Sequence, residues 1–485
     1  MKRIAIGTLK QVAWLLLYGV AGAFLVLLIG FVLFVNSKAD LSVWHTAELD
    51  EEFTEGSAVR SFAEYLELER RLFSQLEERV FERIAPGERS AINRFHRGSL
   101  SDPGRWPRDW NRSTELSTSD PRAGVLLLHG LSDSPYSLRS FGERLHASGA
   151  QVLALRIPGH GTAPVGLARV RWQDMAAAVR LAARHLKDRV PDRPLFLVGY
   201  SNGGALSVLY AISALEDESL PAFDGIVLLS PEIGISPAAA FAVWQERIGR
   251  LLGLEKLKWN SVLPEYDPFK YQSFAVNAGD QAHRLTGEIA RRLGALAAQG
   301  DLGRFPPVLA FQSAVDATVS TPAVIDGLMA RLPDGGHELV LFDLNRMTEI
   351  EHILQHDPAA ELSALLRSGE RRFALTVVTN ASETSRQVVV QHRPAGRSEA
   401  RVTTLDQMWP AEVFSLAHVA LPFPASDPLY GDGSGEESPG IHIGSVALRG
   451  EHGVLQIPAA DMLRQRWNPF HPYIERRLLE FTRLE

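Results

Sequence analysis

The sequence predicts an α/β fold in which helices cover both faces of a mostly parallel β-sheet. Short, continuous apolar runs recur after residue 123, and helical segments such as residues 171–186 separate most of them. Strands that are apolar throughout are buried on both faces, and parallel strands need crossover connections, usually helices. The six runs are residues 124–130, 151–161, 195–201, 225–231, 308–316 and 337–345. Functional side chains are expected at the carboxyl ends of these strands.

An uncharged apolar segment, residues 12–35, precedes this region. As a helix it would be about 36 Å long, enough to cross a hydrocarbon core of about 30 Å. It exceeds the apolar stretch of about 7 to 15 residues in a cleaved signal peptide. We therefore expect a membrane anchor, with a removed signal, cleaved near residues 37–39, as the alternative. Three basic residues precede the segment and only Lys38 follows it closely, which predicts a cytoplasmic N-terminus and an exported (periplasmic or extracellular) main domain.

The composition of the chain excludes several kinds of chemistry. The formal charge of −7 does not suggest binding to nucleic acid, and the absence of cysteine excludes disulfides, thiol catalysis and cysteine-bound metal. Between the anchor and the sheet, residues 61–84 have the apolar spacing of an amphipathic helix that ends before Pro86. We expect this helix to pack on the main domain. Residues 102–121 are typical of a connector that runs over a surface.

The most informative stretch is LFLVGYSNGGALSV, residues 195–208. It has the pattern of a buried strand, a sharp turn and a helix, with G-x-S-x-G at the turn. Small glycines two residues on either side of Ser201 would let the backbone bend tightly and leave the hydroxyl clear of the sheet. A serine can also simply cap a helix. Its position between a strand and a helix favours a nucleophile.

At these residues the chain resembles the α/β hydrolase superfamily, and within it the serine hydrolases that include monoacylglycerol lipases and serine-aminopeptidase-type proteins. Four motifs in the family's order carry the resemblance: LLLHGLSDSP, RIPGHGTAP, GYSNGG and SAVDATV, within residues 124–345. The resemblance implies an α/β hydrolase fold and an oxyanion site formed by the backbone N–H groups of Leu131 and Asn202. His129 and His160 are expected to hold turns rather than to transfer protons.

The family order of serine, acid and histidine implies an acid after the nucleophile. Asp316 ends one of the predicted strands and is the expected carboxylate, with Glu232 as the alternative acid. For the base, His418 stands in an apolar stretch before two prolines, where a buried imidazole would need a partner such as Asp316. His352, with His356 four residues later, is the alternative base because it follows the last predicted strand more closely.

Two long stretches interrupt the pattern. Residues 236–304 predict a helical lid insertion over the strand ends, and residues 347–410 a second insertion that includes a hairpin at residues 373–392. We therefore expect a tail at residues 1–11, the anchor at residues 12–35, a helical and irregular pre-domain at residues 36–120, and the hydrolase domain at residues 121–485. The spacing of His352 and His356 lacks the glutamate and third ligand of a zinc-protease site, so no metal is expected, and no organic cofactor is implied.

These features predict a membrane-anchored serine hydrolase of the carboxylesterase or lipase kind, whose substrates are small-molecule or lipid esters. The oligomeric state is not predicted. The alternatives are an aminopeptidase or other amide or thioester hydrolase, and a catalytically inactive envelope scaffold with the same fold. An aminopeptidase would need an acidic pocket for the substrate amine. The acidic residues available in the predicted lid are Glu246, Glu255, Glu265 and Asp267.

Overall fold

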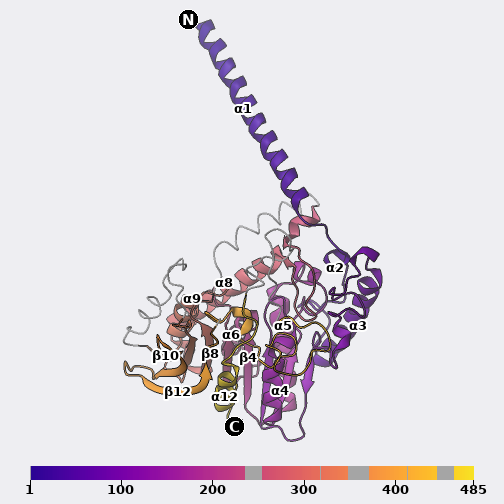
Figure 1. Ribbon diagram of the computed structural model, residues 1–485. Coiled ribbons are helices and arrows are strands. Elements are labelled where there is room, and N and C mark those ends of the chain that lie inside the picture. Colours follow the sequence, from indigo (N-terminus) through magenta and orange to yellow (C-terminus); the bar gives the residue numbers. More distant parts are fainter. Residues whose placement is uncertain (1, 235–253, 317, 348–370, 412, 445–463) are drawn as a thin grey trace.

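The computed structural model describes residues 2–234, 254–316, 318–347, 371–411, 413–444 and 464–485 (Figure 1). The described residues include a ten-stranded sheet with the order β1-β3-β2-β4-β5-β8-β9-β10-β11-β12. A separate two-stranded ribbon is formed by β6 (Trp259–Ser261) and β7 (Phe274–Ala275). The strands of the large sheet are β1 (Thr114–Leu116), β2 (Ala123–Leu128), β3 (Ala150–Leu155), β4 (Leu195–Tyr200), β5 (Gly225–Leu229), β8 (Val308–Ser313), β9 (Glu338–Phe342), β10 (Ala374–Ser382), β11 (Ser385–Arg393) and β12 (Arg401–Met408).

The centre of the sheet is parallel, as predicted, from β3 through β10 in the sheet order. All six expected strands are present, and five of them are buried along their whole length. The physical reason is that each face of these strands meets a layer of helices. β1 adds an antiparallel edge strand within the stretch that the sequence predicted to be a connector.

Helices cover the two faces of the sheet. On one face, α4 (Arg139–Ala147) and α12 (His471–Thr482) share a core with alternate residues of β2 such as Val125 and Leu127. On the other face lie α5 (Trp172–Arg189), α6 (Asn202–Glu216), α8 (Val276–Gln299) and α9 (Thr321–Gly327), packed against Leu126 and Leu128. α8 lies inside the range predicted for the lid, yet its apolar stripe is buried in this core.

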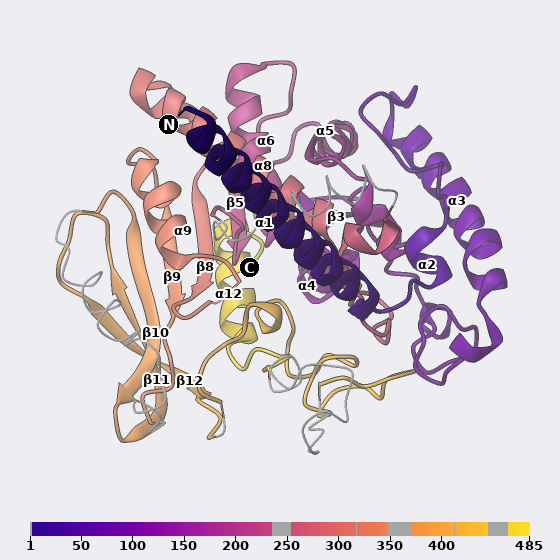
Figure 2. The same ribbon diagram turned by 90° about the horizontal axis from the view of Figure 1, so that it is seen from above.

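Beyond the parallel strands, the hairpin expected at residues 373–392 is formed by β10 and β11. β10 also pairs with β9 in parallel, so the hairpin and β12 extend the main sheet as an antiparallel meander. Figures 1 and 2 show this meander at one end of the molecule and the pre-domain helices α2 (Val43–Thr46) and α3 (Phe62–Arg79) at the other.

The predicted amphipathic helix of the pre-domain is α3. Ser61 caps it, because its side chain accepts the Glu64 N–H while the Glu64 carboxylate accepts the Ser61 N–H at 3.2 Å. Phe62, Tyr65 and Leu68 are buried in the same apolar cluster as the sheet residues of β2 and β3. The expectation that this helix packs on the main domain is therefore confirmed.

The N-terminal helix α1 (Lys2–Ser37) extends away from the rest of the molecule (Figure 1). Its part Trp14–Ser37 is long and apolar enough to cross a membrane, with a mean hydropathy of 2.6. A signal sequence near an N-terminus can meet the same criteria of length and hydropathy, so α1 is a candidate membrane span or signal sequence. Lys38, directly after the helix, donates a hydrogen bond from Nζ to the Trp259 carbonyl at 2.8 Å and so connects α1 to the body.

The C-terminal helix is attached to the sheet by an ion pair whose contribution depends on pH. The Arg477 guanidinium donates two hydrogen bonds to the Glu338 carboxylate, at 3.0 and 2.9 Å. Burial alone would raise the pKa of Glu338, but hydrogen bonds from His392, Arg477 and Thr376 lower it to about 2. Because the pKa is lower in the folded state, the carboxylate stabilises the fold above the unfolded-state pKa, and this contribution is lost as the pH falls through the folded-state value.

We therefore expect Glu338→Gln to reduce the free energy of unfolding by about 3 kcal/mol at pH 7. The difference from the wild type should shrink between about pH 4.5 and pH 2, which urea unfolding at pH 7, 4 and 3 would measure. Glu480→Gln is the matched control, because Glu480 contacts the same guanidinium at 2.8 Å but is 40% exposed. A pH-independent loss in Glu338→Gln would contradict the prediction.

Candidate active site

The turn between β4 and α6 holds Ser201 in a strained backbone conformation. Its φ of 53° and ψ of −117° lie in a region that L-residues rarely occupy. The flanking glycines make this turn possible. A Cβ at Gly199 would lie 2.5 Å from the Gly203 carbonyl oxygen, and one at Gly203 would lie 2.0 Å from the Leu128 carbonyl oxygen. The G-x-S-x-G spacing therefore reflects close backbone contact between β4, α6 and the end of β2.

A substitution at Gly203 tests this contact. Gly203→Ala places a methyl group against two backbone oxygens that cannot move independently of β2. We expect the free energy of unfolding to fall by about 2 kcal/mol or more, measured by urea unfolding. Gly287→Ala in α8 is the control, since nothing lies within 4 Å of its added Cβ and alanine favours a helix. Equal stability of the two variants would contradict the role assigned to Gly203.

The Ser201 hydroxyl contacts an imidazole from far along the chain. His418 Nε2 lies 3.1 Å from Ser201 Oγ, and His418 Nδ1 lies 2.8 Å from Asp316 Oδ2. Ser201 comes from the end of β4, Asp316 from the turn after β8, and His418 from the short helix His418–Ala420 after the meander. An imidazole in this position can take the hydroxyl proton while the carboxylate stabilises the resulting positive charge.

The electrostatics of Asp316 suit this arrangement. Burial alone would raise its pKa, but His418 and the N–H groups of Val319 and Thr318 hold the pKa of Asp316 below its usual value. Asp316 Oδ1 accepts these two N–H groups at 2.9 and 2.8 Å, which leaves Oδ2 facing the imidazole. The carboxylate is therefore ionised near neutral pH and fixed in orientation.

The structure also shows what holds His418. The Tyr200 hydroxyl donates to the His418 carbonyl at 3.3 Å, and the two rings lie 5.3 Å apart. Tyr200 is itself buried, directly before the serine. Tyr200 precedes Ser201 in the G-x-S-x-G turn, called the elbow below, and it thus supports the imidazole of His418. The sequence analysis did not assign this role to Tyr200, and no local pattern indicates it.

The two predicted oxyanion donors lie beside the elbow. Asn202 is the first residue of α6, where no earlier helical carbonyl can accept its N–H, and Leu131 follows the end of β2. In the part of the chain that the structure describes, neither N–H donates to a backbone carbonyl outside regular helix and strand pairing. The N-terminus of α6 favours a negative charge near Ser201.

His129 and His160 hold the neighbouring turns. The Ile157 N–H donates to His129 Nε2 at 3.0 Å, so the protonated Nδ1 donates to the Gly130 carbonyl at 2.9 Å. Burial lowers the pKa of His129 well below its usual value and that of His160 to about 4, so both are neutral at pH 7. His160 Nδ1 contacts the Pro158 carbonyl at 3.0 Å. These contacts fit the expectation that both histidines stabilise turns.

Arg156 connects the pre-domain to the loop that follows β3 and contains His160. We call this set of contacts the Arg156 clamp. The sequence analysis named Arg156 only as part of the RIPGHGTAP motif. The guanidinium donates to Glu69 Oε2 at 3.0 Å, to the two Glu52 oxygens at 2.9 and 3.1 Å, and to the His160 carbonyl at 3.0 Å. Glu52 precedes α3 and Glu69 lies within it. Their contact with Arg156 connects the pre-domain to the loop that supports His129 and, through it, the turn before Leu131.

Of the alternative acid and the alternative base, only the acid Glu232 is among the described residues. His352 and His356 are outside the described residues. The carboxylate of Glu232, the alternative acid, accepts the Asn202 side-chain N–H at 3.0 Å, and its own N–H donates to the Ser201 carbonyl at 3.0 Å. Burial raises the pKa of Glu232. Glu232 therefore stabilises the turn at Ser201 and Asn202. Asp316 is the carboxylate that is hydrogen-bonded to His418.

Three of the four acidic residues considered for an amine pocket, Glu255, Glu265 and Asp267, are engaged in structural contacts. Glu265 accepts the N–H groups of Gln272 and Ser273, and Asp267 accepts the Phe269 N–H and the Tyr430 hydroxyl. Glu255 pairs with Lys258 at 2.8 Å, and Glu246 is outside the described residues.

The parallel sheet with helices on both faces, and a serine on a strained turn between its central strand and the following helix, together define an α/β hydrolase. Residues 119–342 match the family model described as "Serine aminopeptidase, S33". The chain is also similar to the thermostable monoacylglycerol lipase of Bacillus sp. (strain H-257), at 33% identity over 117 residues, which are 24% of this chain and 44% of that protein. The described residues thus have the α/β hydrolase fold, and the chain resembles monoacylglycerol lipases of that fold.

Two further similarities are more distant. The chain is 29% identical to phospholipase YtpA of Bacillus subtilis (strain 168) over 145 residues, which are 30% of this chain and 50% of that protein. It thus spans about half the length of the curated relatives it matches. Among solved structures, the monoacylglycerol lipase of Paleococcus ferrophilus is 20% identical with a TM-score of 0.36, covering 48% of this chain and 88% of that one.

Proposed function

We propose that this protein is a serine hydrolase that cleaves carboxylic esters through an acyl-serine intermediate. The observation that carries the proposal is the contact of His418 with both Ser201 and Asp316, at 3.1 and 2.8 Å, with Ser201 on the turn that directly follows β4. Ser201 is the nucleophile, His418 is first the general base and then the general acid, and Asp316 orients the imidazole. Leu131 and Asn202 supply the N–H groups for the oxyanion.

The reaction follows from these roles. Ser201 Oγ attacks the ester carbonyl carbon while its proton moves to His418 Nε2, and the carbonyl oxygen becomes an oxyanion. When the carbonyl reforms, the bond to the alcohol oxygen breaks and this oxygen takes the proton from His418. Water then attacks the acyl-serine carbonyl carbon and gives one proton to His418. When this second intermediate collapses, the bond between the acyl carbon and Ser201 Oγ breaks, Oγ takes the proton back from His418, and the carboxylic acid is released. No step requires a cofactor.

Acyl lipids are the substrate class that we favour. The curated relatives are named as a monoacylglycerol lipase and a phospholipase, and α1 is a candidate membrane span. We propose that α1 anchors the enzyme with residues 1–11 in the cytoplasm, residues 36–120 as a pre-domain and residues 121–485 as the exported hydrolase domain. Within residues 236–304, the proposed lid excludes α8, because α8 packs in the core. Residues 347–410 form the proposed second insertion. Protease access from the exported side tests this topology.

Two measurements test the activity. The full-length protein is assayed with a short-chain monoacylglycerol and an aminoacyl amide side by side, and is treated with a fluorophosphonate that labels activated serines. We expect ester turnover well above amide turnover, together with labelling. Turnover of the amide alone would favour an aminopeptidase. Neither turnover nor labelling of the folded protein would favour a scaffold without activity.

A further inference from the structure

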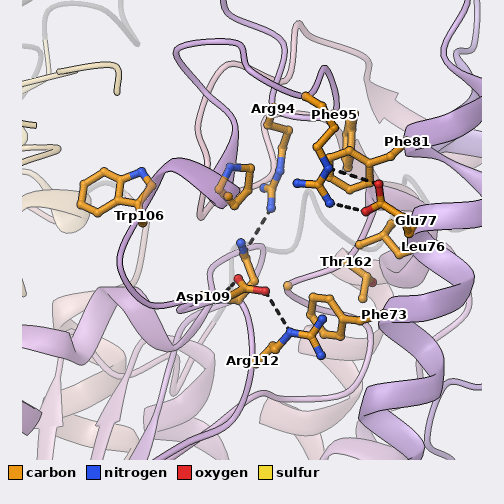
Figure 3. Close-up of a pocket in the computed structure, with 15 residues that line it drawn as sticks. Phe73, Leu76, Glu77, Phe81, Arg94, Phe95, Trp106, Asp109, Arg112 and Thr162 are labelled. Carbon is orange, nitrogen blue, oxygen red and sulfur yellow. Dashed lines mark hydrogen bonds and ion pairs between the residues drawn. The ribbon is translucent and has the colours of Figure 1, made fainter. Parts of the chain in front are cut away.

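A cavity whose wall does not include Ser201 lies between α3 and residues 94–112 (Figure 3). Its volume is about 190 Å³. Aromatic rings of Phe73, Phe81, Phe95 and Trp106 contribute to its wall, and three arginines line it together with two acidic residues. The proposed ester hydrolysis uses none of these residues.

Two of the three arginines are already neutralised. Arg112 Nε donates to Asp109 Oδ2 at 2.9 Å. Arg97 donates to Glu77 through Nε at 3.2 Å and to Asp102 through Nη1 at 2.9 Å. Figure 3 shows Glu77 and the pair of Asp109 with Arg112 on different sides of the cavity. The positive charges of Arg97 and Arg112 are therefore matched by carboxylates of the protein itself.

Arg94 differs from the other two. It is 2% exposed, and its Nη2 donates to Asn111 Oδ1 at 3.2 Å. Among the residues that the structure describes, its Nε and Nη1 have no hydrogen-bond partner. The guanidinium lies 5.4 Å from the ring centres of both Phe95 and Tyr271, which attract its charge but do not accept its in-plane N–H groups. A buried charged donor without an acceptor is costly, and an ion bound nearby is one way to satisfy it.

The surroundings restrict the charge and shape of such an ion. The carboxylates of Glu77, Asp102 and Asp109 lie around the cavity and would repel a dianion more strongly than a monoanion. Nearby Glu265 and Asp267, whose charged forms Arg94 favours, accept hydrogen bonds from other residues. The aromatic wall requires an apolar body on the ligand. A carboxylate on a small apolar group meets both conditions.

We propose that this cavity binds an amphipathic monocarboxylate, with the carboxylate on the Arg94 guanidinium and the apolar group against the aromatic rings. An arginine can bind a carboxylate through charge-assisted hydrogen bonds, and small-ligand sites combine apolar walls with a few polar groups. Gly161 and Thr162 also line the cavity, so the ligand contacts the loop that Arg156 clamps. The inference goes beyond the proposed function and does not depend on Ser201.

Benzoate is a suitable probe because it is soluble and small. Calorimetric titration uses the full-length protein, either untreated or with its active site first blocked by the fluorophosphonate. We expect one saturable benzoate site in both, with neutral benzamide and inorganic phosphate at least tenfold weaker. Absence of saturable binding would overturn the proposal, and so would binding that is lost when the active site is blocked. If the fluorophosphonate does not label the protein, this result counts only against the proposed hydrolase activity. The Ser201→Ala variant then takes the place of the fluorophosphonate-treated protein in the titration.

Amino-acid substitutions test whether Arg94 binds the carboxylate of the ligand. Arg94→Gln is expected to weaken benzoate binding at least tenfold. Arg108→Gln, the control, removes the same charge from an exposed neighbour outside the cavity wall and should leave binding unchanged. Equal affinity of Arg94→Gln and wild type would overturn the proposal. If Arg94→Gln does not fold, Phe81→Glu is measured instead. A carboxylate at this half-buried wall position should weaken benzoate binding at least tenfold and benzamide binding by a smaller factor, and unchanged benzoate binding would refute the site.

Discussion

Ser201→Ala is expected to lower kcat for ester hydrolysis by about 10⁴-fold or more and to abolish fluorophosphonate labelling. The hydroxyl is the only group that contacts His418 Nε2 from the strand-end turn in the described residues, and it lies 3.1 Å from this nitrogen. Without it, no acyl-enzyme forms, and catalysis is limited to water attack near the oxyanion donors. Ester hydrolysis assays at equal concentrations of folded protein measure the loss of kcat. Residual labelling at another serine would contradict the assignment.

The base is tested in the same assay. We expect His418→Ala to lower kcat by a similar factor, because groups that act as a unit give non-additive losses. The double variant Ser201→Ala/His418→Ala should then be no slower than either single variant. His352→Ala is the comparison, since His352 is the alternative base. A large loss in His352→Ala with normal activity in His418→Ala would reassign the base.

Arg156→Met is expected to reduce the free energy of unfolding by about 3–5 kcal/mol. The guanidinium is 1% exposed and is the hydrogen-bond donor to Glu52 and Glu69, whose side chains are 17% and 4% exposed. Burial already raises the pKa of Glu69, and interaction with Arg156 opposes this shift. Removing the arginine leaves a buried carboxylate without its cation. Urea unfolding at pH 7 measures the effect.

Two further variants separate this effect from general damage. Arg156→Met combined with Glu52→Gln and Glu69→Gln should recover part of the lost stability, because no buried charge is left unpaired. Arg70→Gln removes an exposed ion pair of the same α3 helix, with side chains 64% and 51% exposed, and should change stability by less than about 1 kcal/mol. If Arg156→Met lowers the free energy of unfolding no more than Arg70→Gln does, the contacts of Arg156 with Glu52 and Glu69 do not stabilise the fold.

Local patterns predicted much of the hydrolase fold. The six apolar runs and the glycine spacing around Ser201 are short-range signals, because burial of a strand and bending of a turn are decided within a few residues. The same holds for α3, whose cap and apolar spacing are adjacent in the chain. The meander was harder to predict. Its hairpin is a local pattern, but the parallel pairing of β10 with β9 joins strands that residues 343–373 separate along the chain.

The sequence by itself thus determined the class of fold, the position of the elbow and the apolar N-terminal segment. Only the tertiary structure decided which partners meet: His418 with Ser201, 217 residues apart, Arg156 with two pre-domain glutamates, and Arg94 with a cavity of aromatic rings. The physical reason is that these contacts depend on distance in space between elements whose separation along the chain carries no periodic signal. Apolar periodicity specifies which face is buried, but not which polar group lies opposite it.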